Sequence, residues 1–248
     1  MVECEREGIS IVNEKPRQLS TSEFLPDRDI LYVDNHLLVV NKPAGMLVQG
    51  DSTGDLCLLE AARTWVGETY RKPGRVYLGL VHRLDRPASG VLVFARTSKA
   101  AARLSAQFRE RQVQKTYWAL VEGETLPEAT LTHRMERREQ SSRIVRRGGQ
   151  EARLHYRCVG VHQGTSLVEV DLETGRRHQI RLQLAHTGHP ILGDRRYGTS
   201  REFIRGAIAL HARRLTLTHP TRGIEQSFTA DPDWGHFLDG FGVVLPQP

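Results

Sequence analysis

Strand-like runs outnumber helical ones in this sequence, and the two kinds do not alternate in a regular order. Runs dominated by branched aliphatic and aromatic residues lie at 30–33, 37–41, 91–95, 115–123, 165–175 and 209–220. A doubly wound sheet would need a helix after nearly every strand. We therefore predict an α+β fold with a mixed, largely antiparallel β-sheet core flanked by helices and loops.

Two segments predict helices between these runs. Residues 98–112 place Leu104 and Phe108 four positions apart, and Ser98 is the expected N-cap. Residues 176–188 suit a second helix that ends at Gly188.

The chain has 248 residues, which fits one large domain or two small ones. Residues 1–27 are polar and irregular, so we predict an N-terminal extension there and one main domain over 28–248. No apolar run is long enough for a membrane helix, and the acidic start has no signal-peptide pattern. The three cysteines lie far apart and predict reduced thiols. We expect a cytoplasmic protein that has no membrane partner.

The net charge is +6, and 30 of the 35 basic residues are arginines. Arginine pairs with phosphates and stacks on bases, so this balance favours a polyanionic partner. A GC-rich genome also favours arginine, and composition alone leaves both explanations open.

The stretch VHRLDRPASG sets Asp85 between two arginines. Nearby positive charge favours the ionised carboxylate. Such a group is either a structural ion pair that holds a turn, or a desolvated nucleophile or base.

Two further segments are rich in arginine. Five arginines and one acid lie between 176 and 196, and on a helix Arg177 and Arg181 would share one face. We expect a phosphate-facing ridge there, unless the face is only solvated. Residues 134–153 hold seven arginines and three glutamates. They predict a mobile basic hairpin or loop that grips nucleic-acid backbone, or an ordinary solvated loop.

Tyr117 and Trp118 are neighbours on a predicted strand, so one should face the core and the other a cleft. An aromatic ring in a basic cleft can stack on an unpaired base, although core packing is the commoner fate.

Several other chemistries lack their motifs. The HRLD stretch is like the kinase catalytic loop, but the Gly-rich loop, the Asp-Phe-Gly motif and the Walker motif are missing. His178, His186 and His189 do not have metal-site spacing and have no clustered acid, so we predict no metal. No Gly-x-Ser-x-Gly elbow or dinucleotide fingerprint occurs.

Taken together, the stretches HRLDRPASGVLVFARTSKAA, KTYWALVEG and TGRRHQIRLQLAHTGHPILGDRRYG resemble the RluA-type pseudouridine synthases in content and order. The segments ILYVDNHLLVVNKPAGMLV and ALHARRLTLTHP also resemble that family. The resemblance runs from about residue 28 to about residue 230 and makes 28–248 the catalytic domain.

This resemblance implies an isomerase that flips uridine out of RNA, detaches the base at nitrogen and rejoins it through carbon 5. It implies no cofactor. Asp85 matches the essential aspartate, as nucleophile or as base, and Arg181 matches its partner. Tyr117 matches the tyrosine that stacks on the base and helps remove the carbon 5 proton. Ile180 matches the apolar wall, and Arg83 matches the residue that fills the gap left by the flipped nucleotide.

The chain departs from the family pattern in three places. Ala88 replaces the usual threonine, Leu182-Gln183 replaces Val-His, and too few residues precede Asp29 for the small RNA-binding domain of many relatives. We therefore expect the catalytic domain itself to choose the ribosomal or transfer RNA, and we expect a monomer. The alternative is a non-catalytic RNA-binding or ribosome-assembly protein on the same fold.

Overall fold

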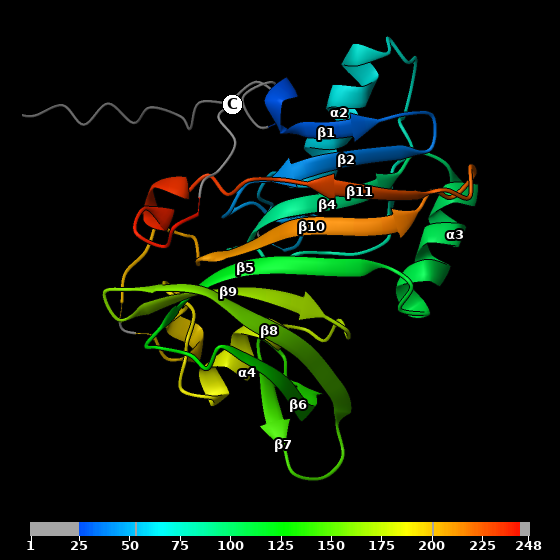
Figure 1. The fold of residues 1–248 in the computed structure, drawn as a ribbon. Coiled ribbons are helices and arrows are strands. Elements are labelled where there is room, and N and C mark those ends of the chain that lie inside the picture. Colours follow the sequence, from blue (N-terminus) through cyan, green and yellow to red (C-terminus); the bar gives the residue numbers. More distant parts are fainter. Residues whose placement is uncertain (1–24, 53, 200, 244–248) are drawn as a thin grey trace, which may run out of the picture.

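The computed structural model describes residues 25–52, 54–199 and 201–243. Most of the predicted N-terminal extension, residues 1–27, lies outside the described residues. The strands of the described chain join in one eleven-stranded sheet with the order β1-β2-β4-β10-β5-β9-β8-β6-β7. Strand β11 pairs with β10, and β3 pairs with β4 (Figure 1).

The strands are β1 (Ile30–Val33), β2 (Leu37–Lys42), β3 (Gly79–Leu80), β4 (Ser89–Ala95), β5 (Gln114–Glu122), β6 (Glu128–Arg137), β7 (Ser142–Val145), β8 (Gln150–His162), β9 (Thr165–Leu172), β10 (Leu210–Thr218) and β11 (Glu225–Thr229). The α-helices are α2 (Leu58–Thr69), α3 (Ser98–Arg109) and α4 (Gln179–His186). Short 3-10 turns span Asp27–Asp29, Arg195–Tyr197 and Gly235–Leu238.

The sheet is mixed and mostly antiparallel, as predicted. Within the described chain, β4 and β10 run parallel and the other named strand pairs are antiparallel. All seven residues of β4 are buried, because side chains of both apolar clusters cover the two faces of this strand. The near-continuous apolar run of β4 follows from this position.

Alternating side chains of the central strands feed two apolar clusters. Val39 and Val93 pack with Leu104 of α3 in one cluster. Leu38, Leu92 and residues of α2 and α4 belong to the other. Successive strand residues point to opposite faces, so α3 covers one face of this part of the sheet, while α2 and α4 pack with the opposite set of side chains.

The parallel β4–β10 contact fixes the strand that follows the Asp85 loop. Gly90 has a φ of +113°, and a Cβ there would lie 2.4 Å from the carbonyl oxygen of Ala212, so a larger residue does not fit. Beside it, the Ser89 hydroxyl is 2.8 Å from His211 Nδ1, and His211 Nε2 is 2.9 Å from the carbonyl oxygen of Ala230. Burial lowers the pKa of His211 to about 4, so this imidazole is neutral at pH 7 and donates from one nitrogen only.

The predicted strands at 30–33, 37–41 and 91–95 are confirmed with small changes in their ends. The prediction that Ser98 caps α3 was wrong. Thr97 is the N-cap, and its hydroxyl accepts from the Ala100 amide at 3.1 Å. The second predicted helix is shorter than expected and begins at Gln179, because His178 has a left-handed φ of 55°. Helix α2 had no counterpart among the predictions.

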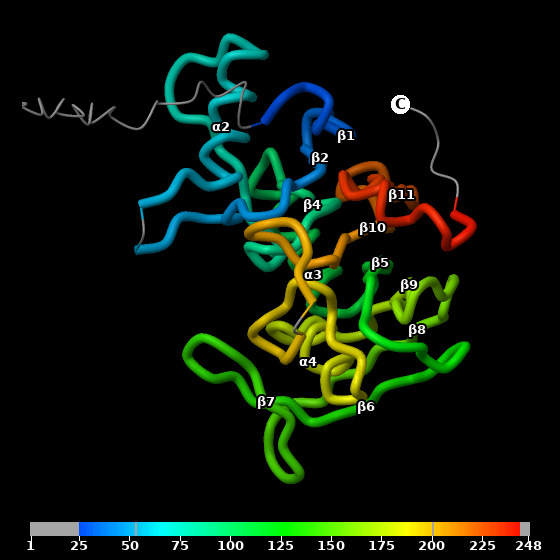
Figure 2. The backbone as a smooth tube through the Cα atoms, turned by 90° about the vertical axis from the view of Figure 1, so that its left-hand side faces the viewer, coloured from blue at the N-terminus to red at the C-terminus, as the bar shows by residue number. Residues whose placement is uncertain are grey.

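The arginine-rich segment 134–153 forms an antiparallel hairpin of β6 and β7 that continues into β8. Figure 2 shows this hairpin beside α4, at the opposite end of the molecule from α2. None of the described helices is long and apolar enough to cross a membrane.

Candidate functional site

The loop that carries Asp85 connects β3 to β4 and is held by backbone contacts on both sides. The Ala88 amide donates to the carbonyl of Asp85 at 3.1 Å and closes a turn. The amide of Gly45 donates to the carbonyl of Arg86 at 2.8 Å, and the amide of Ile208 donates to Pro87 at 3.0 Å. The position of Asp85 is therefore set by segments more than a hundred residues apart in sequence.

Lys42 is the buried centre of this loop cluster. Its ammonium donates to the carbonyls of Pro43 and Met46, both at 2.8 Å, and of Arg86 at 3.2 Å. Burial lowers the pKa of Lys42 to about 7, although the charge of Asp85 acts in the other direction. Lys42 therefore holds the backbone on which Asp85 sits, a role that the sequence analysis did not assign.

Arg181 connects two carboxylates. Its Nη1 donates to Asp85 Oδ2 at 3.0 Å, while Nε and Nη2 donate to Asp194 at 2.6 and 2.8 Å. The side chains of Arg181 and Asp194 are 6% and 1% exposed, and that of Asp85 is 21% exposed. Burial disfavours the charged guanidinium, but the hydrogen bonds and charges of the two aspartates outweigh it and raise the pKa of Arg181.

This arrangement leaves one oxygen of Asp85 available. Its contacts with the described side chains, to Arg181 and to His178 at 3.7 Å, both use Oδ2. Asp85 also belongs to the lining of a cavity of about 650 Å³. The loop thus presents a partly exposed carboxylate with a free oxygen to a space large enough for a nucleotide.

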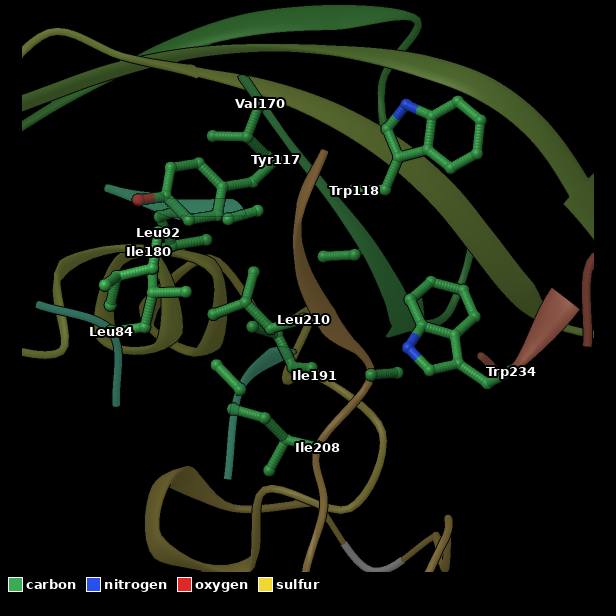
Figure 3. Packing of buried hydrophobic residues seen from close by; sticks show 14 of the residues in the cluster. Leu84, Leu92, Tyr117, Trp118, Val170, Ile180, Ile191, Ile208, Leu210 and Trp234 are labelled. Atoms are coloured by element: carbon green, nitrogen blue, oxygen red, sulfur yellow. The ribbon is translucent and has the colours of Figure 1, made fainter. Parts of the chain in front are cut away.

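Tyr117 and Ile180 line the same cavity as this carboxylate. Both are buried, and Figure 3 shows Ile180 and Leu84 grouped beside the Tyr117 ring. Trp118 points to the other side of β5, as strand alternation requires. Burial, followed by the charge of Asp85, raises the pKa of the Tyr117 phenol, so it stays neutral at pH 7. The prediction that one of the two aromatics faces a cleft is confirmed for Tyr117.

His178 is a second site residue that the sequence analysis used only in rejecting a metal site. Its Nδ1 is 2.8 Å from the Tyr197 hydroxyl, and its Nε2 faces Asp85. Burial lowers the pKa of His178 to about 4, Asp85 opposes this, and nearby arginines add to it. The imidazole is therefore neutral at pH 7, and Arg181 is the charged partner of Asp85.

The cavity is strongly basic. Asp85 and Glu173 are the carboxylates of its lining, whereas its cations are Arg83, Arg109, Arg111, Lys115, Arg137, Arg176, Arg177 and Arg181. Glu173 already pairs with Arg153 at 3.1 Å. This excess of positive charge attracts a polyanion to the mouth of the cavity.

The expectation that Arg177 and Arg181 share one helical face was wrong. Arg177 precedes helix α4, and its Nη1 donates to the carbonyl of Glu139 at 2.8 Å. Arg181 is buried and bound to carboxylates. Arg83 is exposed and belongs to the cavity lining.

Two residues that depart from the family pattern, Ala88 and Gln183, are both buried. Ala88 is buried in the loop turn. Gln183 is buried in α4, and its amide nitrogen donates to the carbonyls of Leu131 and Ala152 at 3.0 and 3.2 Å. It therefore joins α4 to strands β6 and β8.

In the part of the chain that the structure describes, no three His, Cys, Asp or Glu side chains are grouped closely enough to hold a metal ion.

Comparison with known proteins gives one consistent result. The family model described as RNA pseudouridylate synthase matches residues 36–186. The chain is 34% identical to the ribosomal large subunit pseudouridine synthase C of Buchnera aphidicola, over 91% of this chain and 74% of that protein. It is 35% identical to the tRNA pseudouridine synthase C of Yersinia pestis, over 86% of this chain and 91% of that protein.

Solved structures agree. The human RNA pseudouridylate synthase domain containing 4 superposes with a TM-score of 0.75 at 26% identity, over 92% of this chain and 97% of that one. The human RNA pseudouridylate synthase domain containing 1 has a TM-score of 0.68 at 29% identity, over 84% and 85% of the two chains.

Proposed function

The chain belongs to the RNA pseudouridylate synthase family, and we propose that it isomerises uridine to pseudouridine in ribosomal or transfer RNA with Asp85 as the essential carboxylate. Members of this family are isomerases. The observation that carries the assignment of Asp85 is its free oxygen, directed by Arg181 into a basic cavity beside a buried tyrosine.

The reaction needs no net gain or loss of atoms. The bond between the ribose C1′ and the base nitrogen breaks, the base rotates, and a new bond forms from C1′ to carbon 5. Carbon 5 then loses its proton, and the freed nitrogen gains one. A stacked nucleotide hides this bond, so the uridine must leave the stack at a cost of a few kcal/mol. The apolar side of Ile180 and the ring of Tyr117 offset that cost by sandwiching the base, and Arg83 fills the place it leaves.

Asp85 acts on the ribose or the base as a nucleophile, or removes a ribose proton as a base. In either role the carboxylate must remain ionised and correctly directed, and Arg181 serves both needs. The phenol of Tyr117 is neutral while Asp85 is charged. Once the carboxylate is neutralised during the reaction, its contribution to the raised pKa of Tyr117 disappears and the phenol gives up its proton more easily. The phenol can then pass its own proton to the detached base nitrogen and take up the carbon 5 proton in its place.

Further proposals concern the whole chain. Residues 28–248 form the catalytic domain, and the β6–β7 hairpin is one of its contact surfaces for RNA. The protein acts as a monomer in the cytoplasm, where ribosomal and transfer RNA are found. The non-catalytic alternative has no observation in its favour, since the Asp85, Tyr117 and Arg181 set is intact.

The test is tritium release from carbon-5-labelled uridine in separate pools of unmodified transfer and ribosomal RNA. Wild type and Asp85→Asn are assayed in parallel. We expect release from one pool by wild type alone, with RNA binding kept in the variant. Release by a pure Asp85→Asn protein would refute the role of Asp85. Binding of both pools without any release by wild type would favour the non-catalytic alternative.

A further inference from the structure

Lys115 at the start of β5 has a position that the proposed reaction does not use. Its side chain lines the cavity of Asp85, two residues before Tyr117 and on the same face of the strand. Two residues on a strand span about 7 Å. The backbone of Lys115 is therefore one such step from Tyr117, towards the start of β5.

The ammonium also reaches across to the opposite wall of the cavity. A Cβ placed on Gly175, in the segment between β9 and α4, would lie 3.7 Å from Lys115 Nζ. Lys115 thus lies at the boundary between the β5 wall and the 173–178 segment of the cavity.

Lys115 has no anionic partner within the described chain. Its side chain makes no hydrogen bond or ion pair with a described residue, and the two carboxylates of the cavity are bound to Arg181 and Arg153. The side chain is half-buried, and burial, with a further contribution from Arg111, lowers the pKa of Lys115 to about 8. A partly desolvated cation without a counter-ion gains from any anion that enters.

We propose that Lys115 binds one of the two phosphates that flank the target uridine, and so positions the flipped nucleotide over Asp85. This inference rests on the proposed function for the identity of the ligand. Within a nucleotide, the phosphate lies one ribose away from the base, which matches the separation of Lys115 from Tyr117. Arg111 and Arg137, at the cavity lining, are left for phosphates farther along the strand.

The experiment is a double-mutant cycle in which one change is made in the protein and the other in the RNA, and the affinity is measured for each combination. The probe is a short synthetic stem-loop RNA with a single uridine in its loop. It is made in natural form and with a neutral methylphosphonate at the phosphate on the 5′ side of the uridine, on the 3′ side, or in the stem. Affinities are measured for wild type, Lys115→Gln and Lys115→Arg, with Lys72→Gln as a control at an exposed lysine outside the cavity.

We expect Lys115→Gln to weaken binding of natural RNA on the order of tenfold or more, because a charged hydrogen bond is removed. One flanking methylphosphonate should weaken wild type by a similar factor and should not weaken Lys115→Gln further. Lys115→Arg should keep most of the affinity. The slope of log K against log salt should fall by about 0.7 to 0.9 in Lys115→Gln and stay unchanged in Lys72→Gln.

The proposal would be overturned if both flanking methylphosphonates weakened RNA binding by Lys115→Gln as much as they weaken binding by wild type. Equal affinities of Lys115→Gln and wild type for natural RNA would also overturn it. Equal weakness of Lys115→Arg and Lys115→Gln would also overturn it, since a role for the charge predicts rescue. The binding cycle does not depend on turnover. If the effects of Lys115→Gln and of the methylphosphonate are coupled but wild type releases no tritium, the proposed function alone is refuted. If wild type releases tritium but the two effects are independent, the role of Lys115 alone is refuted.

Discussion

Replacing Asp194 by asparagine tests whether the buried Arg181–Asp194 pair directs the catalytic carboxylate. Asp194 accepts two hydrogen bonds from Arg181, at 2.6 and 2.8 Å, and its side chain is 1% exposed. An asparagine keeps the shape, but its amide nitrogen would face a guanidinium N–H, so one of these bonds and the negative charge are lost.

The magnitude follows from this geometry. A charged hydrogen bond contributes about 1.5–3 kcal/mol, and breaking a buried ion pair costs about 3–5 kcal/mol. Because one bond survives, we expect Asp194→Asn to lower the free energy of unfolding by about 2–4 kcal/mol. The freed guanidinium can then turn to bind both oxygens of Asp85 and occupy the one that faces the cavity. We expect kcat to fall about tenfold to a hundredfold, since small displacements of reacting groups have effects of that size.

Urea unfolding gives the stability, and single-turnover tritium release gives the rate. Glu60→Gln is the matched control, because Glu60 forms a comparably short ion pair with Arg63 at 2.5 Å, and its side chain is 55% exposed. The control should lose at most about 1 kcal/mol and no activity. Wild-type stability in Asp194→Asn would refute the energetic reasoning. A destabilised variant with an unchanged single-turnover rate would refute the positioning role.

Three further outcomes are expected. Lys42→Met should lower the free energy of unfolding by about 3 kcal/mol or more in urea titrations, because three buried carbonyls lose their donor; an unchanged midpoint would contradict this. The imidazole of His211 has a folded-state pKa of about 4, below its unfolded value, so the unfolded chain binds the extra proton and stability falls as the pH drops from about 6.5 towards 4. This loss amounts to about 2 kcal/mol at pH 5 and should be absent from the pH dependence of His211→Gln, and parallel curves for the two proteins would refute it. Replacing Arg146 and Arg147 by glutamine should lower the salt slope of RNA binding by about 0.7 to 0.9 for each phosphate that the hairpin no longer neutralises; Arg143 should contribute less because it already pairs with Glu136 at 2.7 Å, and an unchanged slope would make the hairpin only a solvated surface.

Local patterns in the sequence were sufficient for many elements. Strands β1, β2 and β4 and helix α3 follow from side-chain periodicity, which depends on neighbours within a few residues. The arginine-rich strands β6 to β8 were not distinguished from a mobile loop, because arginines and other exposed side chains separate their few buried positions. The buried hydrophobic residues are Leu131, Met135, Ala152, Leu154 and Tyr156. Their strand conformation comes from cross-strand pairing, which a local pattern does not contain.

The sequence by itself determined the fold class, the family resemblance and the candidate residues Asp85, Tyr117, Ile180 and Arg181, because these lie in ordered motifs. Only the tertiary structure decided how the residues act. The contact of Arg181 with Asp85 joins residues 96 positions apart in the sequence. Asp194 binds this arginine, Lys42 binds the backbone of the Asp85 loop, and Lys115 lines the same cavity. The start of α4 depended on the conformation of His178, which Tyr197 holds from another segment. Burial and charge pairing arise only when distant segments pack together. These two effects leave Asp194 buried against Arg181 and leave one oxygen of Asp85 open to the cavity.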